Sequence, residues 1–285
     1  MKKIILSLTI AIIIIISSVI TGCTDKSDEN TPTSDNTGVS GEIDTDTDTE
    51  TTYERNPDVK DPLRIGVPNV SIPPMIIWED GELTGFEMAL IAETAKRLGV
   101  SYEIIGINPG TEREMLEDDT IDCAWGNMMD TGKQRLFYSM TDPYITIPQA
   151  IAVYEDSEIK ENSDIRNISV IMSSPAERLA DENKLDINFK RVSASRDYSK
   201  TFEQLADGYS DAVICDKTIA DYMKNLDDKI IILDESAAEA QYSVAFRQSD
   251  ENMMKAADTV LKNIYGEGIL STLAVKWFGE DISIE

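Results

Sequence analysis

Strand and helix patterns alternate along most of this 285-residue chain, and this alternation restricts the folds that the chain can adopt. An apolar run over residues 63–68 predicts a strand, and an amphipathic helix follows over residues 84–98. A strand over 101–107, a helical segment over 111–118 and a strand over 120–126 continue the pattern. This β-α-β-α-β order predicts an α/β fold with a mainly parallel sheet and helices on both faces.

The first predicted helix has clear start and stop signals. Thr84 can cap its first turn, and Glu87, three residues later, completes a capping box. Leu90 and Ile91 follow at helical spacing, and Gly99 ends the helix.

A second series of alternating elements begins near residue 168. The expected strands and helices are, in chain order, 168–173, 175–183, 187–192, 199–208, 211–216, 217–225 and 229–233. A second α/β unit inserted within the first accounts for this restart. We therefore predict lobe 1 from residues 62–150 and 245–285 and lobe 2 from residues 151–244, joined by extended crossovers near 148–154 and 241–247. Ligands of such sheets bind beyond the carboxyl ends of the strands, so a cleft between the lobes is expected.

The N-terminus has the features of a secretory signal. Two lysines precede an apolar run over residues 4–16, and small residues lead to Cys23. Residues 20–23, Ile-Thr-Gly-Cys, resemble the bacterial lipobox, in which the cysteine receives a diacylglyceryl group and further acylation such as palmitate. We expect residues 1–22 to be removed and Cys23 to anchor the chain in the cell membrane.

The composition excludes several classes of function. Residues 23–61 are rich in Asp, Glu, Ser and Thr, which predicts a disordered acidic tether after the lipidated cysteine. The net charge of −27 argues against nucleic acid as a partner. The chain has no histidine, and Cys123 and Cys215 lie in apolar runs that predict buried packing positions. We therefore expect no metal site, no cofactor and no Ser-His or Cys-His catalytic pair.

Several motifs in order resemble the bacterial extracellular solute-binding proteins of family 3, the polar amino-acid receptors of ABC importers. These motifs cover residues 71–99, 120–144, 151–159, 207–223, 242–250 and 261–279. The resemblance implies a two-lobed periplasmic-binding-protein type II fold that closes on an amino acid or similar zwitterion. It also implies a lipid-anchored monomer on the extracytoplasmic face that delivers its ligand to an ABC permease.

The same resemblance implies an acidic partner for the ligand's ammonium. The family's aspartate at the end of the second-lobe strand corresponds to Asp216. The alternative is that Asp216 only caps the following helix.

The partner of the ligand's carboxylate is less clear from the sequence. The family's arginine column falls on Gln134, between Lys133 and Arg135, and an alignment on Thr131 favours Lys133. We favour Arg135, because only a guanidinium binds a carboxylate with two parallel hydrogen bonds. The alternative is that all three side chains are solvated and the backbone alone holds the carboxylate.

Other candidates surround these groups. Ser173 and Ser174 resemble the family's hydroxyl turn, which meets the ligand carboxylate in lobe 2. Ile72 and Met129 replace aromatic and hydroxyl residues, which implies a more apolar pocket. The remaining candidates for the pocket are Asn127, Trp125, Phe86 and Tyr144, and the three aromatic residues are equally suited to the core.

Two other functions fit the same fold. Relatives within the family include periplasmic cyclohexadienyl dehydratases, and a carboxylate or lysine can act as acid or base without histidine. The third possibility is a binding subunit that reports to a sensor. We favour the receptor, which is not an enzyme, because no further catalytic constellation is visible.

Overall fold

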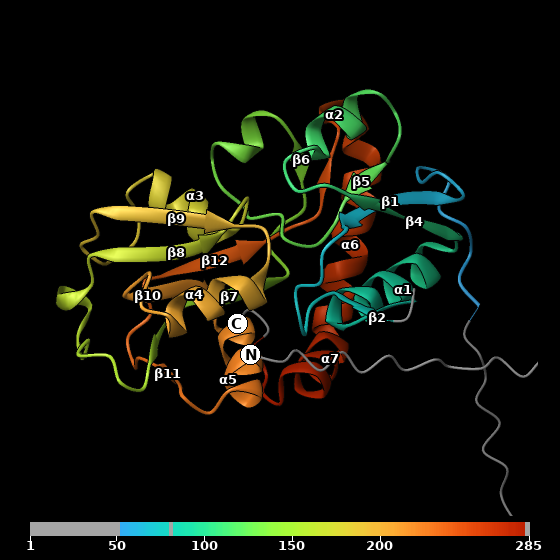
Figure 1. Ribbon diagram of the computed structural model, residues 1–285. Helices are drawn as coiled ribbons and strands as arrows, with labels where there is room; N and C mark the ends of the chain where they lie inside the picture. The colour runs from blue at the N-terminus through green and yellow to red at the C-terminus, as the bar shows by residue number, and fades with distance from the viewer. Residues whose placement is uncertain (1–51, 80–81, 283–285) are drawn as a thin grey trace, which may run out of the picture. The chain divides into compact units, whose positions relative to one another are not determined.

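The computed structural model describes residues 52–79 and 82–282 (Figure 1). The predicted signal sequence, Cys23 and most of the predicted tether lie outside these residues. No helix in the described ranges is long and apolar enough to span a membrane.

The first sheet has the strand order β4-β1-β5-β13-β6. Its strands are β1 (Leu63–Pro68), β4 (Tyr102–Ile107), β5 (Cys123–Ala124), β6 (Ser139–Met140) and β13 (Ala245–Phe246). The strands β4, β1 and β5 are parallel, as predicted, whereas β13 runs antiparallel to β5 and β6. Around it lie the hairpin β2 (Ile77–Glu79) with β3 (Glu82–Thr84) and the helices α1 (Phe86–Leu98), α2 (Glu112–Glu117), α6 (Glu251–Gly266) and α7 (Ile269–Phe278).

The second sheet has the order β11-β7-β10-β8-β9, with β12 also paired to β7. Its strands are β7 (Ile145–Tyr154), β8 (Asn167–Ile171), β9 (Arg191–Ser195), β10 (Ala212–Asp216), β11 (Ile230–Ile232) and β12 (Ala238–Tyr242). The helices around this sheet are α3 (Pro175–Asp181), α4 (Tyr198–Ala206) and α5 (Lys217–Leu226). Elsewhere along the chain, short 3-10 helices cover Gln134–Leu136, Asn162–Asp164 and Gln248–Asp250. Five of its six strands run in the same direction, and the crossover strand β7 runs antiparallel to its neighbours β10, β11 and β12. Each sheet is therefore mainly parallel, as the alternation predicts, with one antiparallel strand, β13 in the first sheet and β7 in the second.

The start of α1 differs from the predicted capping box. Thr84 lies in β3, and Gly85 takes the capping position with φ of 120° and no side-chain cap. A side chain at Gly85 would collide with the carbonyl oxygen of Met75, so a close backbone approach fixes this residue as glycine. The predicted stop is confirmed, since Gly99 has φ of 66° and its N–H bonds the last turn.

Residues 56–61, assigned to the tether by composition, pack on the first lobe. The Asn56 N–H donates to the Leu98 carbonyl at 2.8 Å, and Val59 is buried. Lys60 pairs with the buried Asp122 at 2.7 Å. The tether prediction therefore extends too far, because a few specific contacts order a segment whose average composition is polar.

Candidate ligand-binding site

Asp216 ends β10 and precedes α5, at the carboxyl edge of the second sheet. Its carboxylate is buried and accepts hydrogen bonds from the Tyr242 hydroxyl at 2.6 and 2.7 Å and from Gln149 Nε2 at 2.5 Å. Its side chain does not cap α5, so the alternative role of helix cap is not the one that the structure has. Tyr242 and Gln149 come from the crossover strands β12 and β7, which bring neutral donors to the end of β10.

The electrostatic setting of Asp216 is unusual for a carboxylate. No cation forms an ion pair with it among the described residues. Burial raises the pKa of Asp216 to about 6, although the hydrogen bonds from Tyr242 and Gln149 oppose this rise. The Oε1 atom of Gln149 is also buried and has no hydrogen-bond partner in the described part of the chain. The Asp216 carboxylate and Gln149 Oε1 are therefore neighbouring hydrogen-bond acceptors, and no cation of the described residues balances them.

The turn after β5 has a different environment. Its residues Thr131, Lys133 and Gln134 line a cavity of about 200 Å³, together with lobe-2 residues from α3 and its end. The complete lining is Met129, Thr131, Lys133, Gln134, Phe137, Arg178, Leu179, Asp181 and Glu182. Lys133 and Gln134, two of the three candidates for the carboxylate partner, therefore line the same cavity as residues of α3.

Arg135 makes a different set of contacts. Its guanidinium donates to both oxygens of Asp130, at 2.8 and 2.6 Å, and to the carbonyl oxygens of Met140 and Thr141, at 3.2 and 3.0 Å. These bonds tie the turn to β6 and raise the pKa of Arg135, with the Asp130 hydrogen bonds as the main cause. Its role in ligand binding stays a prediction.

The hydroxyl turn of lobe 2 is largely self-satisfied. Ser174 caps α3 by accepting the Glu177 N–H at 3.2 Å, and Glu177 in return accepts the Ser173 N–H at 2.6 Å. Asn127 Nδ2 donates to the Ser173 carbonyl at 3.4 Å, which brings these two candidates together from different sheets. Both residues have left-handed backbone angles, with φ of 62° and 61°.

The apolar candidates lie in the core of the first lobe. Ile72 is buried and pairs with Ile76 through an isolated bridge. The Phe86 ring packs against that of Phe278, with 4.9 Å between centroids. Their burial is typical of core packing.

Trp125 and Tyr144 share a buried carboxyl group. The Trp125 indole and the Tyr144 hydroxyl each donate to Glu87 at 2.8 Å. Burial raises the pKa of Glu87 to about 7, against the opposing effect of these hydrogen bonds. Glu87 therefore does not cap the helix as predicted but links α1 to the residue after β5 and to the residue before β7.

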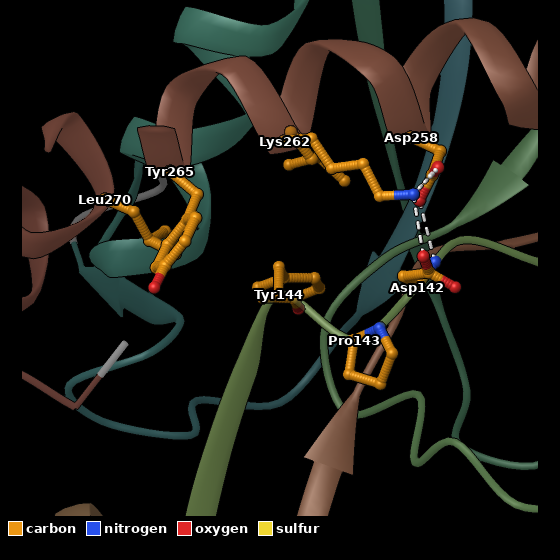
Figure 2. Close-up of a pocket in the computed structure, with 8 residues that line it drawn as sticks. Asp142, Pro143, Tyr144, Asp258, Lys262, Tyr265 and Leu270 are labelled. Atoms are coloured by element: carbon orange, nitrogen blue, oxygen red, sulfur yellow. Dashed lines mark hydrogen bonds and ion pairs between the residues drawn. The ribbon is translucent and has the colours of Figure 1, made fainter. Parts of the chain in front are cut away.

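A separate cavity of about 130 Å³ lies under α6 (Figure 2). Figure 2 shows Lys262 bridging Asp142 and Asp258, both at 2.7 Å, beside Tyr144 and Tyr265. Its one cation is already neutralised by two carboxylates, so this cavity is not suited to hold a carboxylate ligand.

Three residues at these sites were not predicted from the sequence: Gln149, Tyr242 and Arg178. Gln149 is a polar residue within an apolar crossover strand, which is a signal that sequence reasoning can use. Tyr242 begins the motif at 242–250. Arg178 lies among other charged residues of α3 and carries no local signal. Cys123 and Cys215 are buried, as predicted.

Comparisons with known proteins identify the family of the chain. Residues 63–280 match the family of bacterial extracellular solute-binding proteins, family 3. The L-cystine-binding protein TcyJ of Escherichia coli K12 is 24% identical over 226 residues, which cover 78% of this chain and 84% of TcyJ. The arginine-binding extracellular protein ArtP of Bacillus subtilis 168 is 26% identical over 204 residues, 70% of this chain and 80% of ArtP.

Solved structures share the fold. The ancestral amino acid-binding protein AncCDT-1, a precursor of cyclohexadienyl dehydratase, superposes with a TM-score of 0.67 at 24% identity, covering 76% of this chain and 95% of its own. This likeness shows the two-lobed type II periplasmic-binding-protein fold. Because the family match extends over most of the chain, this protein belongs to the bacterial extracellular solute-binding proteins of family 3.

Proposed function

We propose that this protein binds an amino acid or a similar small zwitterion between its two lobes and delivers it to an ABC importer. The observation that carries the proposal is Asp216, a buried carboxylate with neutral donors and no cation among its described neighbours. A ligand ammonium supplies the missing positive charge, and Gln149 Oε1 is suited to accept one of its N–H groups. The names of the relatives TcyJ and ArtP support an amino acid as the ligand.

Binding and closure are coupled by the same charges. A carboxylate buried without a partner is costly, so closing the lobes is unfavourable when the cleft is empty. An ammonium beside Asp216 removes this cost and shifts the population toward the closed form. The carboxylate end of the ligand is assigned to the cavity lined by Thr131, Lys133 and Gln134, while Arg135 holds the turn in place.

The test is calorimetry of the purified protein with the twenty standard L-amino acids and L-cystine. We expect saturable one-to-one binding of at least one of them. Binding of none contradicts the proposal. Incubation with prephenate and arogenate tests the enzymatic alternative, which the likeness to AncCDT-1 raises, and we expect no product.

The pH dependence of binding follows from Asp216. Its pKa of about 6 in the free protein lies above the usual value for Asp, and an ammonium beside it favours the ionised form. Protonation therefore competes with the ligand, and affinity falls as pH drops below 6, by about tenfold for each pH unit. Titrations at pH 8 and pH 5 check this, and equal affinities at the two values contradict it.

We further propose that a lipid on Cys23 holds the protein on the extracytoplasmic face of the cell membrane, and that it acts as a monomer. The support is the lipobox-like sequence at residues 20–23. Mass spectrometry of the N-terminal peptide from membranes should find a diacylglyceryl-modified Cys23. An unmodified cysteine rules out the anchor.

A further inference from the structure

Arg178 is a partly buried cation that has no hydrogen-bond or ion-pair partner among the described residues. Its Nη1 atom is buried and has no hydrogen-bond acceptor, and the guanidinium forms no ion pair with any residue in the described ranges. A buried N–H group left without an acceptor is destabilising, and more so when it carries charge. Such a group is typical of a site that is completed by a ligand.

The surroundings of Arg178 favour an anion. It lines the 200 Å³ cavity together with Lys133, Thr131 and Gln134 from the first lobe. Two acidic residues line the cavity: Glu182 is already paired with Lys184 at 2.6 Å, and Asp181 is exposed. Two cations from different lobes therefore face one space, with no carboxylate bonded to either.

Other donors near this cavity are already used. The Arg135 guanidinium donates its hydrogen bonds to Asp130 and to two carbonyl groups. The Ser173 N–H is bonded to the Glu177 carboxylate. The other two charged or amide candidates of the turn, Lys133 and Gln134, donate no side-chain hydrogen bond within the described residues, and neither is a guanidinium.

Arg178 is also well placed relative to Asp216. It lies four residues after Ser174, and its N–H bonds the Ser174 carbonyl at 3.2 Å, so its side chain slopes back over the turn that starts α3. Met129, which lines the same cavity, pairs with Tyr242 through an isolated bridge. The Tyr242 hydroxyl in turn bonds Asp216. One residue therefore separates the cavity from the proposed ammonium site.

We propose that Arg178, from the second lobe, supplies the guanidinium that binds the α-carboxylate of the zwitterion, with Lys133 facing the same carboxylate from the first lobe. This inference rests on the proposed function and adds the residue that binds the carboxylate end of the ligand. Arg178 and Lys133 repel each other when the cavity is empty, and an anion between them relieves this repulsion. Carboxylate binding thus favours closure from both lobes.

The experiment compares Arg178→Gln with the wild-type protein. Each of the twenty standard L-amino acids and L-cystine that binds the wild type is titrated together with its carboxamide, which lacks the negative charge. We expect Arg178→Gln to weaken binding of the amino acid by about 30-fold or more. We expect it to leave binding of the amide unchanged, so that discrimination between acid and amide is largely lost. Arg178→Lys, which keeps the charge but not the two-pronged geometry, should be intermediate.

The control is Arg191→Gln, the same substitution at an exposed residue that starts β9 and does not line the cavity, and it should leave both affinities unchanged. Thermal unfolding should show that Arg178→Gln is folded, because the replaced guanidinium has no bonds to lose. If Arg178→Gln discriminates acid from amide as strongly as the wild type does, the inference is wrong and the proposed function stands. If the wild type binds no amino acid, the proposed function itself fails.

Discussion

Replacing Asp216 with asparagine is expected to abolish amino-acid binding while leaving the fold intact. The asparagine oxygen can still accept from Tyr242 and Gln149, so the local hydrogen bonds survive. The buried negative charge that balances the ligand ammonium is lost. We expect a loss of 2–5 kcal/mol or more, the usual effect of removing one partner of a buried charge pair, which is about 30-fold to several thousand-fold in affinity. Calorimetry measures it.

Asp221→Asn is the matched control for this change. It removes the same charge from the same lobe, five residues further along the chain, where Asp221 is partly exposed on α5 and bonded to Lys217. Its affinity should equal that of the wild type. If Asp216→Asn binds as tightly as Asp221→Asn, Asp216 is not the ammonium partner.

The second large effect concerns stability. Asp122 is fully buried, and Arg64 and Lys60 approach it at 2.7 Å, with Arg247 at 3.2 Å. Burial alone would raise its pKa, but the hydrogen bonds from Arg64 and Lys60 hold the pKa of Asp122 well below its usual range. Asp122→Asn leaves these cations without their buried anion. We expect the free energy of unfolding to fall by about 3–5 kcal/mol, measured by urea denaturation at pH 7.

Asp119 provides the control for Asp122. It contacts the same cations, at 2.9 to 3.2 Å, but its side chain is 62% exposed, so Asp119→Asn should destabilise the fold much less than Asp122→Asn does. The effect of Asp122→Asn should also depend on pH. Because the folded pKa of Asp122 is lowered, its contribution is present above the unfolded pKa and is lost as pH falls toward the folded one. Equal destabilisation by the two variants contradicts this account.

Much of the fold is predictable because its signals are local. The strand at 63–68, the end of α1 at Gly99 and the parallel pairing of three strands in each sheet follow from periodicity and alternation. The antiparallel strand β7 is a crossover, and an extended crossover has the same apolar pattern as any buried strand. The sequence therefore contains no signal for its direction in the sheet.

The site depends on contacts that span the chain. Glu87 has the spacing of a capping residue, yet its partner Trp125 lies 38 residues away. Arg135 has the chemistry of a carboxylate partner, and only the tertiary structure shows that Asp130 and two carbonyls use it. Arg178 is the reverse case: an ordinary helix residue by sequence, distinguished by a missing partner. Asp216 is the candidate whose position at a strand end marks it from sequence alone.

A crystal structure of the complex with the amino acid that binds most tightly tests the central claim most directly. The distance to measure joins the ligand's ammonium nitrogen to the carboxylate oxygens of Asp216. The account predicts about 2.7–2.9 Å, the range of a charge-assisted hydrogen bond. A ligand whose ammonium bonds other groups, with Asp216 still held by Tyr242 and Gln149 alone, would contradict it.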